Sequence, residues 1–99
     1  MSDRIGGYTR AEVEELRISG LRVVVVDVRT PEEYSQGTAL GAEHVTPDRL
    51  AALAPTWVDA TVVTVCAHGG NRSQGAAAKL RELGVSSAAH LVGGVSGGR

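Results

Sequence analysis

A valine-rich run at residues 22–28 constrains the fold of this chain more than any other feature. It reads Arg-Val-Val-Val-Val-Asp-Val. A continuous β-branched run of this kind is typical of a strand that is buried on both faces, and such strands occupy the centre of parallel sheets. The run therefore predicts a central parallel strand.

Helix signals alternate with strand signals along the rest of the chain. Thr9 and Glu12 form a capping box that predicts a helix to about Ser19, with Gly20 as its stop. Thr30 predicts the start of a second, short helix, with Pro31 at its first position, Glu33 completing a capping box and its end near Gly37. We also expect a brief strand at 43–45, a helix at 47–53, a strand at 61–65 and a last strand at 88–92. Between the last two strands, Ser73 should open a helix that ends before Gly84, with its inward face formed by Ala76, Ala77, Leu80 and Leu83.

This alternation predicts the α/β class, with an open, mostly parallel sheet and helices on both faces. In such sheets, ligand sites lie beyond the carboxyl ends of the strands. Ninety-nine residues, 42% of them apolar, suffice for one small domain. We therefore expect residues 1–99 to form a single domain.

Charge and cysteine content narrow the function classes. Ten basic and eleven acidic residues, without a long run of one sign, give no reason to expect a nucleic-acid or membrane partner. A single cysteine excludes an internal disulfide and fits a reducing compartment. The longest apolar run, residues 23–26, is too short to cross a bilayer, and residues 1–10 lack the apolar core of a secretory signal. We expect a cytoplasmic location.

Residues 62–75 carry the strongest functional signal. A β-rich run delivers the only cysteine, Cys66, into a glycine-rich loop that leads directly into a helix. Backbone N–H groups of such a loop, together with the positive end of the helix dipole, attract an anion. A thiol placed there, with Arg72 closing the loop, should have a lowered pKa and be mostly thiolate. Gly69 and Gly70 fit a loop that needs φ values which side chains resist. The alternative is that Cys66 is only a small buried hydrophobic residue at the end of a strand.

The chain resembles the rhodanese (sulfurtransferase) family over roughly residues 9–95. The resemblance rests on four segments in register: the cysteine loop, residues 27–34 (Asp-Val-Arg-Thr-Pro-Glu-Glu-Tyr), residues 37–45 and residues 91–95. It implies a rhodanese-like fold and a double-displacement reaction. In that reaction the Cys66 thiolate takes sulfur from thiosulfate or a persulfide donor, and a thiol, cyanide or a protein cysteine removes it. No organic cofactor is needed.

The same resemblance implies a set of site residues. Cys66 would be the nucleophile, loop amides of residues 67–71 would stabilise the persulfide anion, and Arg72 would orient the oxyanion end of the donor. The substrate-binding residues that we expect are Ala67, His68, Gly69, Gly70, Asn71, Arg72 and Ser73. Asp27 and Arg29 would brace the loop and the following helix, although we favour a purely structural hydrogen-bond network for this pair.

The three histidines are not expected to carry the chemistry. His68 could act as a general acid or add charge to the rim of the site, but tolerance of an exposed loop position explains it better. His44 and His90 fall in expected strands and are interpreted as structural. No group of His, Cys, Asp and Glu has metal-ligand spacing, so no metal is predicted.

Two departures from the family pattern leave alternatives open. Five residues, rather than the four of the common sulfurtransferase loop, separate Cys66 from Arg72. This Cys-x5-Arg spacing resembles cell-cycle phosphatases and rhodanese-like arsenate reductases, although Val65 stands where those phosphatases carry a histidine. Sulfur transfer stays the first hypothesis, an oxyanion enzyme the second and a non-catalytic binding module the third. The second departure is that residues 96–99 show no signal for the closing C-terminal helix usual in the family, so we expect a domain without that helix and open apolar surface near Val92 and Val95.

Overall fold

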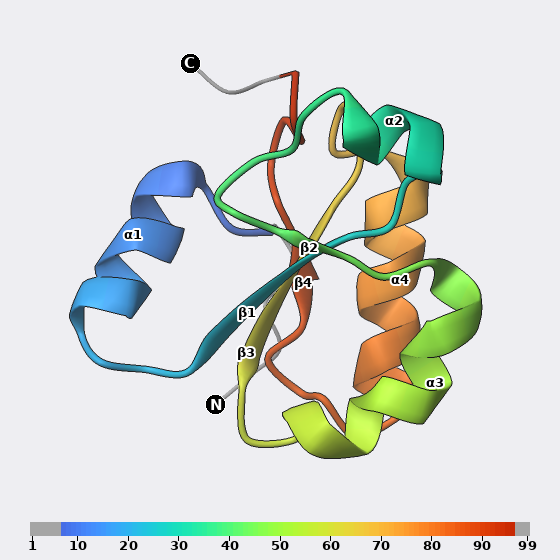
Figure 1. Cartoon of the computed structure of the whole chain (residues 1–99). Coiled ribbons are helices and arrows are strands. Elements are labelled where there is room, and N and C mark those ends of the chain that lie inside the picture. Colours follow the sequence, from blue (N-terminus) through green and yellow to red (C-terminus); the bar gives the residue numbers. More distant parts are fainter. Residues whose placement is uncertain (1–6, 97–99) are drawn as a thin grey trace.

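A four-stranded, fully parallel sheet forms the centre of the protein in the computed structural model, which describes residues 7–96 (Figure 1). The strands are β1 (Val23–Asp27), β2 (Glu43–His44), β3 (Thr61–Val65) and β4 (Ala89–His90), in the order β2-β1-β3-β4. β1 and β3 pair along five residues each. The valine-rich run is therefore confirmed as a central parallel strand.

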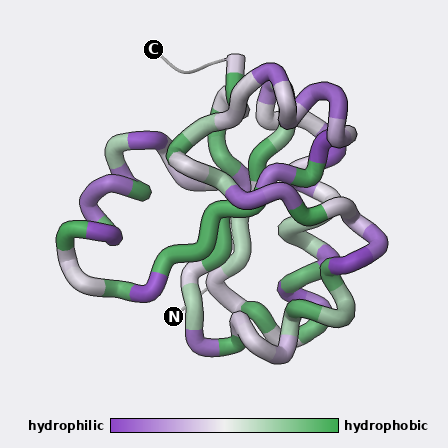
Figure 2. Tube along the Cα trace, in the orientation of Figure 1, coloured by the Kyte–Doolittle hydropathy of each residue, from purple (hydrophilic) through white to green (hydrophobic). Residues whose placement is uncertain are grey.

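Helices cover both faces of the sheet, as predicted. α1 (Arg10–Ile18) lies on one face, and α3 (Leu50–Leu53) and α4 (Asn71–Glu82) lie on the other. α2 (Pro31–Ser35) follows the carboxyl end of β1, near the start of α4. Figure 2 shows the central strands as the most hydrophobic part of the trace.

Alternation along the strands divides the core into two clusters. Val25 and Val63 face the α1 side, whereas their neighbours Val26 and Val62 face the α3 and α4 side. Successive strand side chains point to opposite faces, so a run of valines supplies both layers at once. All four of these side chains are at most 5% exposed.

Both predicted capping boxes are present. The Thr9 hydroxyl accepts from the Glu12 backbone N–H (3.1 Å), and the Glu12 carboxylate accepts from the Thr9 N–H (2.9 Å). Thr30 and Glu33 make the same reciprocal pair at 3.2 Å in each direction. The two helix starts thus follow from local hydrogen bonding alone.

Three predicted boundaries are wrong. α4 begins at Asn71 rather than Ser73, because the Gly70 carbonyl already accepts the first helical bond, from the Gln74 N–H (3.1 Å). The predicted helix at 47–53 is divided into a 3-10 turn, η1 (Pro47–Arg49), and α3, and a second 3-10 turn, η2 (Ala54–Trp57), follows. The last strand pairs over only two residues, after which Leu91 forms an isolated bridge with Tyr8.

The predicted inward stripe of α4 is correct for three of its four members. Ala76, Ala77 and Leu80 are buried, but Leu83 is 37% exposed. Leu83 is the residue that caps the helix end, where the chain leaves helical geometry, and Gly84 follows with φ +101°. The glycine stop itself is therefore confirmed.

The segment after β4 is more closed than expected. Val95 packs against the α1-side cluster, whereas Val92 is 45% exposed. The prediction of open apolar surface is thus correct for Val92 and wrong for Val95, which the Gly93–Gly94 turn folds back onto the core. Residues 97–99, and the expectations placed on them and on residues 1–6, lie outside the described residues. In the described part of the chain, every helix is too short or too polar to span a membrane.

Candidate active site

Cys66 stands at the carboxyl end of the central strand β3, the edge at which ligand sites are expected. Its side chain is 3% exposed. The thiol donates to the Ser73 hydroxyl oxygen (3.1 Å), and that hydroxyl donates to the Gly70 carbonyl (3.3 Å). The sulfur therefore lies between the strand end and the first turn of α4.

The surroundings of Cys66 stabilise its thiolate more than water stabilises a free thiolate. Burial raises the pKa of the thiol, but hydrogen bonding with the Ser73 hydroxyl, which donates to the thiolate in place of the Gly70 carbonyl, and with the backbone N–H groups of Ser73, His68 and Gly70 outweighs burial and leaves the pKa below its ordinary value. The physical cause is a ring of donors at a helix start that stabilises negative charge on sulfur. The ring includes the amide of Ser73, an expected substrate-binding residue that lies two positions beyond the loop amides 67–71 expected to stabilise the anion.

The two loop glycines play different roles. Gly69 has φ +73°, in the left-handed region, and a Cβ there would lie 2.7 Å from the Gly93 nitrogen. Gly70 has φ −95° and open space around it. The prediction of a side-chain-resistant backbone is therefore correct for Gly69 and wrong for Gly70, whose N–H instead contributes to the donor ring.

A glycine turn at residues 93–94 packs against the backbone of the cysteine loop. Gly94 has φ +60°, and a Cβ on it would lie 2.2 Å from the Cys66 carbonyl oxygen. The N–H groups of Val95 and Ser96 donate to the carbonyls of Cys66 and Ala67, both at 2.9 Å. Sequence analysis used residues 91–95 only as a segment of the family resemblance, and a Gly-Gly pair after the last strand is the one signal that could have indicated this contact.

Arg72 is paired with Glu33. Its Nη1 and Nη2 donate to Glu33 Oε1 (2.8 Å) and Oε2 (3.1 Å), so the fork engages both carboxylate oxygens. This pairing lowers the pKa of Glu33 to about 2. The sequence indicated Glu33 only as a capping residue and gave no sign of the partner 39 residues away.

Asp27 and Arg29 form a buried ion pair beside the loop. Arg29 Nη2 donates to Asp27 Oδ2 (2.7 Å), with the two side chains 7% and 0% exposed. Thr38 Oγ1 donates to the same oxygen (2.6 Å), and Arg29 Nη2 also donates to the Gly37 carbonyl (2.5 Å). Burial raises the pKa of Asp27, but these hydrogen bonds outweigh it and lower the pKa below 3.8. The pair holds the end of β1 to the segment after α2.

The remaining predicted site residues lie on the rim or away from it. His68 is exposed, with Nδ1 2.5 Å from the Ser96 hydroxyl, and Asn71 is exposed on the first turn of α4. Gln74, which sequence analysis did not single out, donates to the Gly69 carbonyl (2.9 Å). His44 stacks on Tyr34 with a centroid distance of 4.9 Å, away from the sulfur-binding ring of donors.

His90 lies in β4. Its pKa is lowered mainly by burial and to a smaller extent by the nearby charge of Arg81. No group of three or more His, Cys, Asp or Glu side chains within residues 7–96 is placed to hold a metal ion.

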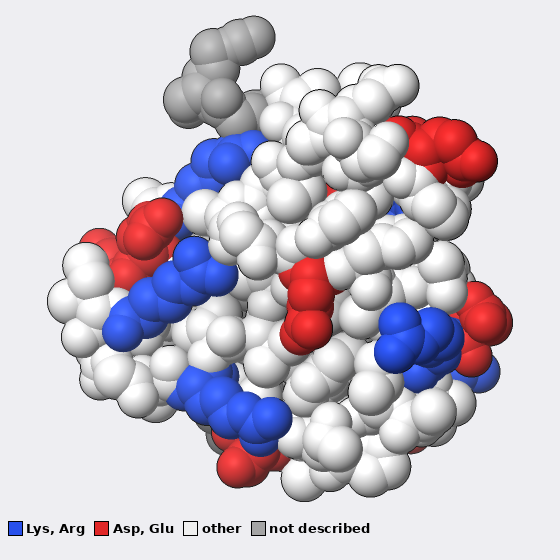
Figure 3. Space-filling view, viewed as in Figure 1, with Lys and Arg blue, Asp and Glu red and all other residues white. Residues whose placement is uncertain are grey.

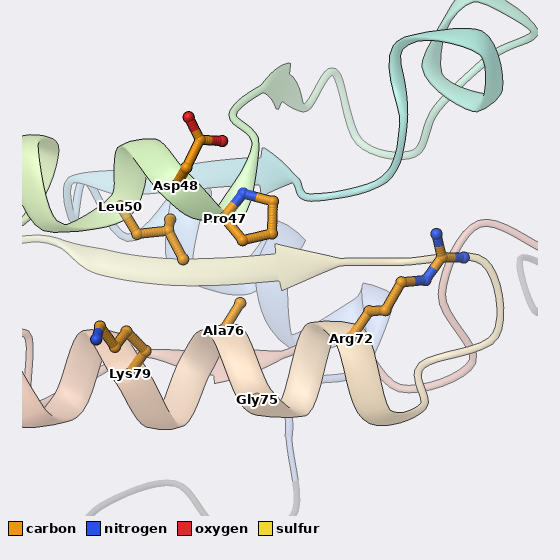
Figure 4. Close-up of a pocket in the computed structure, with 7 residues that line it drawn as sticks. All are labelled: Pro47, Asp48, Leu50, Arg72, Gly75, Ala76 and Lys79. Atoms are coloured by element: carbon orange, nitrogen blue, oxygen red, sulfur yellow. The ribbon is translucent and has the colours of Figure 1, made fainter.

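A groove of about 470 Å3 runs along α4 from Arg72. Figure 4 shows Arg72 and Lys79 toward its two ends, with Pro47 and Leu50 on the facing wall and Ala76 between. Its surface thus combines apolar walls with two cations of α4 and the Asp48 carboxylate. In the view of Figure 3, basic and acidic side chains are interspersed, so this face carries no large basic patch.

Comparison with known proteins assigns the chain to a family. The family model of the rhodanese-like domain matches residues 9–98. The chain belongs to the rhodanese family. Within that family, the thiosulfate sulfurtransferase GlpE of Pseudomonas aeruginosa is 37% identical over 95 residues, covering 95% of this chain and 84% of the relative.

Two solved rhodanese-like structures bear on function. The human single-domain sulfurtransferase TSTD1 has a TM-score of 0.74 and 26% identity, covering 89% of each chain. A protein of unknown function from Rhodopseudomonas palustris, described as a possible tyrosine phosphatase, has a TM-score of 0.66 and 30% identity, covering 89% of this chain and 74% of the other. The rhodanese fold of this chain is therefore shared by relatives described with two different chemistries.

Proposed function

We propose that this rhodanese-like chain is a sulfurtransferase that moves sulfane sulfur from thiosulfate or a persulfide donor to a thiophilic acceptor through Cys66. The observation that carries the proposal is the ring of donors that lowers the pKa of Cys66 at the end of β3. The likeness to a curated thiosulfate sulfurtransferase over nearly the whole chain supports it.

The reaction is two displacements at sulfur. The Cys66 thiolate attacks the outer sulfur of thiosulfate, the sulfur–sulfur bond of the donor breaks, and sulfite leaves with the electron pair, so Cys66 becomes a persulfide. A thiolate or cyanide then attacks the outer sulfur of the persulfide and regenerates the Cys66 thiolate. Each step balances without an external oxidant or reductant.

The loop supplies the electrostatic stabilisation. The N–H groups of His68, Gly70 and Ser73 that bond the cysteine sulfur are placed to stabilise a persulfide anion at the same position. Arg72 orients the sulfonate end of thiosulfate, because a guanidinium fork can engage two oxygens of one anion. Asp27 and Arg29 are positioning residues that hold the end of β1 to the segment after α2.

The decisive experiment is intact-mass spectrometry of the protein after incubation with thiosulfate. One added sulfur atom that maps to Cys66 and disappears with cyanide is the expected result. Turnover of thiosulfate and cyanide without any sulfur on Cys66 would contradict the persulfide mechanism.

A second candidate, an oxyanion enzyme acting on a phosphate ester or arsenate, is favoured by the Cys-x5-Arg spacing and by the relative described as a possible tyrosine phosphatase. Parallel assays with thiosulfate, a small aryl phosphate, and arsenate plus a thiol separate the two. Turnover confined to arsenate or the ester would replace sulfur transfer as the function.

A further inference from the structure

The ion pair between Glu33 and Arg72 bears on how the anionic sulfur donor binds, an inference that rests on the proposed function. Both Nη atoms of Arg72 are engaged by one carboxylate, at 2.8 and 3.1 Å. A carboxylate is itself a two-oxygen anion, the shape for which a guanidinium fork is suited. Glu33 therefore occupies the same donor groups that an incoming sulfonate would need.

Glu33 is held in place by its own helix. Its Oε1 also accepts from the backbone N–H and the hydroxyl of Thr30, both at 3.2 Å. These bonds belong to the capping box of α2, so the carboxylate stays in front of Arg72 and keeps two partners when Arg72 leaves it. Because the pKa of Glu33 is about 2, its negative charge is constant at physiological pH.

The pair can open without a large structural change. Arg72 and Glu33 side chains are 47% and 35% exposed, and ion pairs this accessible are weak because water competes for both partners. Arg72 also borders the groove along α4, so a released guanidinium has open space beside it. Glu33 can therefore compete with an anionic ligand for Arg72, and an anionic ligand can displace Glu33.

We infer that Glu33 is a positioning residue that competes with the anionic donor for Arg72 and thereby sets the donor KM. Donor binding exchanges one oxyanion for another on the same fork. Removing the competitor should tighten binding of every oxyanion that uses Arg72, whereas the chemical step at Cys66 should change little.

The test variant is Glu33→Gln, because glutamine at this position preserves a capping box while removing the charge. With thiosulfate and cyanide, the thiosulfate KM should fall by about two- to fivefold, the factor that corresponds to an exposed ion pair, and kcat should stay within about twofold. Glu32→Gln is the matched control, since Glu32 is an exposed residue of the same turn with the same charge, and no ion pair of Glu32 is found in the described part of the chain.

A double-mutant cycle checks that Glu33 acts through Arg72. In an Arg72→Ala background, Glu33→Gln should no longer change the KM. An unchanged or raised KM in Glu33→Gln, an equal fall in Glu32→Gln, or a persistent effect without Arg72 would each overturn the inference.

Binding of sulfate, monitored by NMR shifts of the loop amides, separates this inference from the proposed function because it needs no turnover. Tighter sulfate binding by Glu33→Gln than by wild type and Glu32→Gln supports the competition even if no persulfide forms on Cys66. Equal sulfate affinity in the three proteins contradicts it even if sulfur transfer is established.

Discussion

The carbonyl oxygen of Cys66 accepts a hydrogen bond from the backbone N–H of Val95 at 2.9 Å. Cys66 is therefore held at two points, by the donor ring on its sulfur and by the glycine turn on its backbone. Gly94 makes this approach possible, because even one methyl group on it would overlap the Cys66 carbonyl.

Gly94→Ala should consequently disrupt the loop. The Cβ would lie 2.2 Å from the Cys66 oxygen, so the turn must move and the loop amides must shift with it. We expect sulfur-transfer activity to fall by at least tenfold, since small displacements of catalytic groups are costly. Gly20→Ala is the control, because Gly20 has a similar φ of +84° but open space around it. Steady-state kinetics and melting temperatures of both variants should show stability loss in each and activity loss only in Gly94→Ala.

Cys66→Ser should abolish turnover of thiosulfate and cyanide. The serine hydroxyl can accept hydrogen bonds from the same N–H groups, but it is a far weaker nucleophile than a thiolate. The free energy of unfolding should change by about 1 kcal/mol or less, because the hydrogen-bonded geometry survives. Retained turnover in a correctly folded variant would show that the nucleophile lies elsewhere.

Ser73→Ala should shift the pH dependence of the reaction. The Ser73 hydroxyl helps to lower the pKa of Cys66, so its loss raises that pKa and reduces the thiolate fraction near neutral pH. We expect kcat/KM at neutral pH to fall by about tenfold, as for loss of a hydrogen bond to a charge, and to recover partly as the pH rises. Ser19→Ala, which removes an exposed hydroxyl at the end of α1, should leave the pH–rate profile unchanged.

Asp27→Asn should destabilise the fold strongly. The change leaves the Arg29 guanidinium buried without its carboxylate, which costs about 3–5 kcal/mol. Because the folded pKa of Asp27 lies below its ordinary value of 3.8, the carboxylate contributes stability above that pH and loses it as pH falls through the folded pKa. Urea unfolding measured at a series of pH values from neutral to acid should show the free energy of unfolding falling in the wild type. The fall should be smaller in the variant.

Asp59→Asn is the control for that comparison. Asp59 pairs with Arg22 at 2.6 Å, but the two side chains are 75% and 49% exposed. Its replacement should cost only about 0–1 kcal/mol. Equal losses in Asp27→Asn and Asp59→Asn would show that the buried pair has no special role.

Arg72→Lys should raise the thiosulfate KM more than it lowers kcat. Lysine keeps the charge but lacks the planar fork, so it cannot hold two oxygens of the donor at once. Identical kinetic constants in the two proteins would mean that Arg72 does not contact the donor.

Local sequence determined most of the fold of this protein. The capping boxes at Thr9 and Thr30 and the glycine stop at Gly84 act within a few residues, so their hydrogen bonds can be inferred from spacing. The valine-rich run specified a strand buried on both faces in the same way. The sequence also predicted correctly that Cys66 follows a strand, β3, at the carboxyl edge of the sheet.

Only the tertiary structure decided what surrounds that cysteine. The contacts from Glu33 to Arg72, Val95 to Cys66 and Gly94 to the loop join residues that lie about 25 to 40 positions apart, and such pairs leave no periodic or spacing signal in one sequence. The helix start at Asn71 also depended on backbone geometry at Gly70 rather than on a side-chain cap. Patterns in one chain encode local hydrogen bonds and burial, whereas side-chain pairing across elements is settled by how the layers pack.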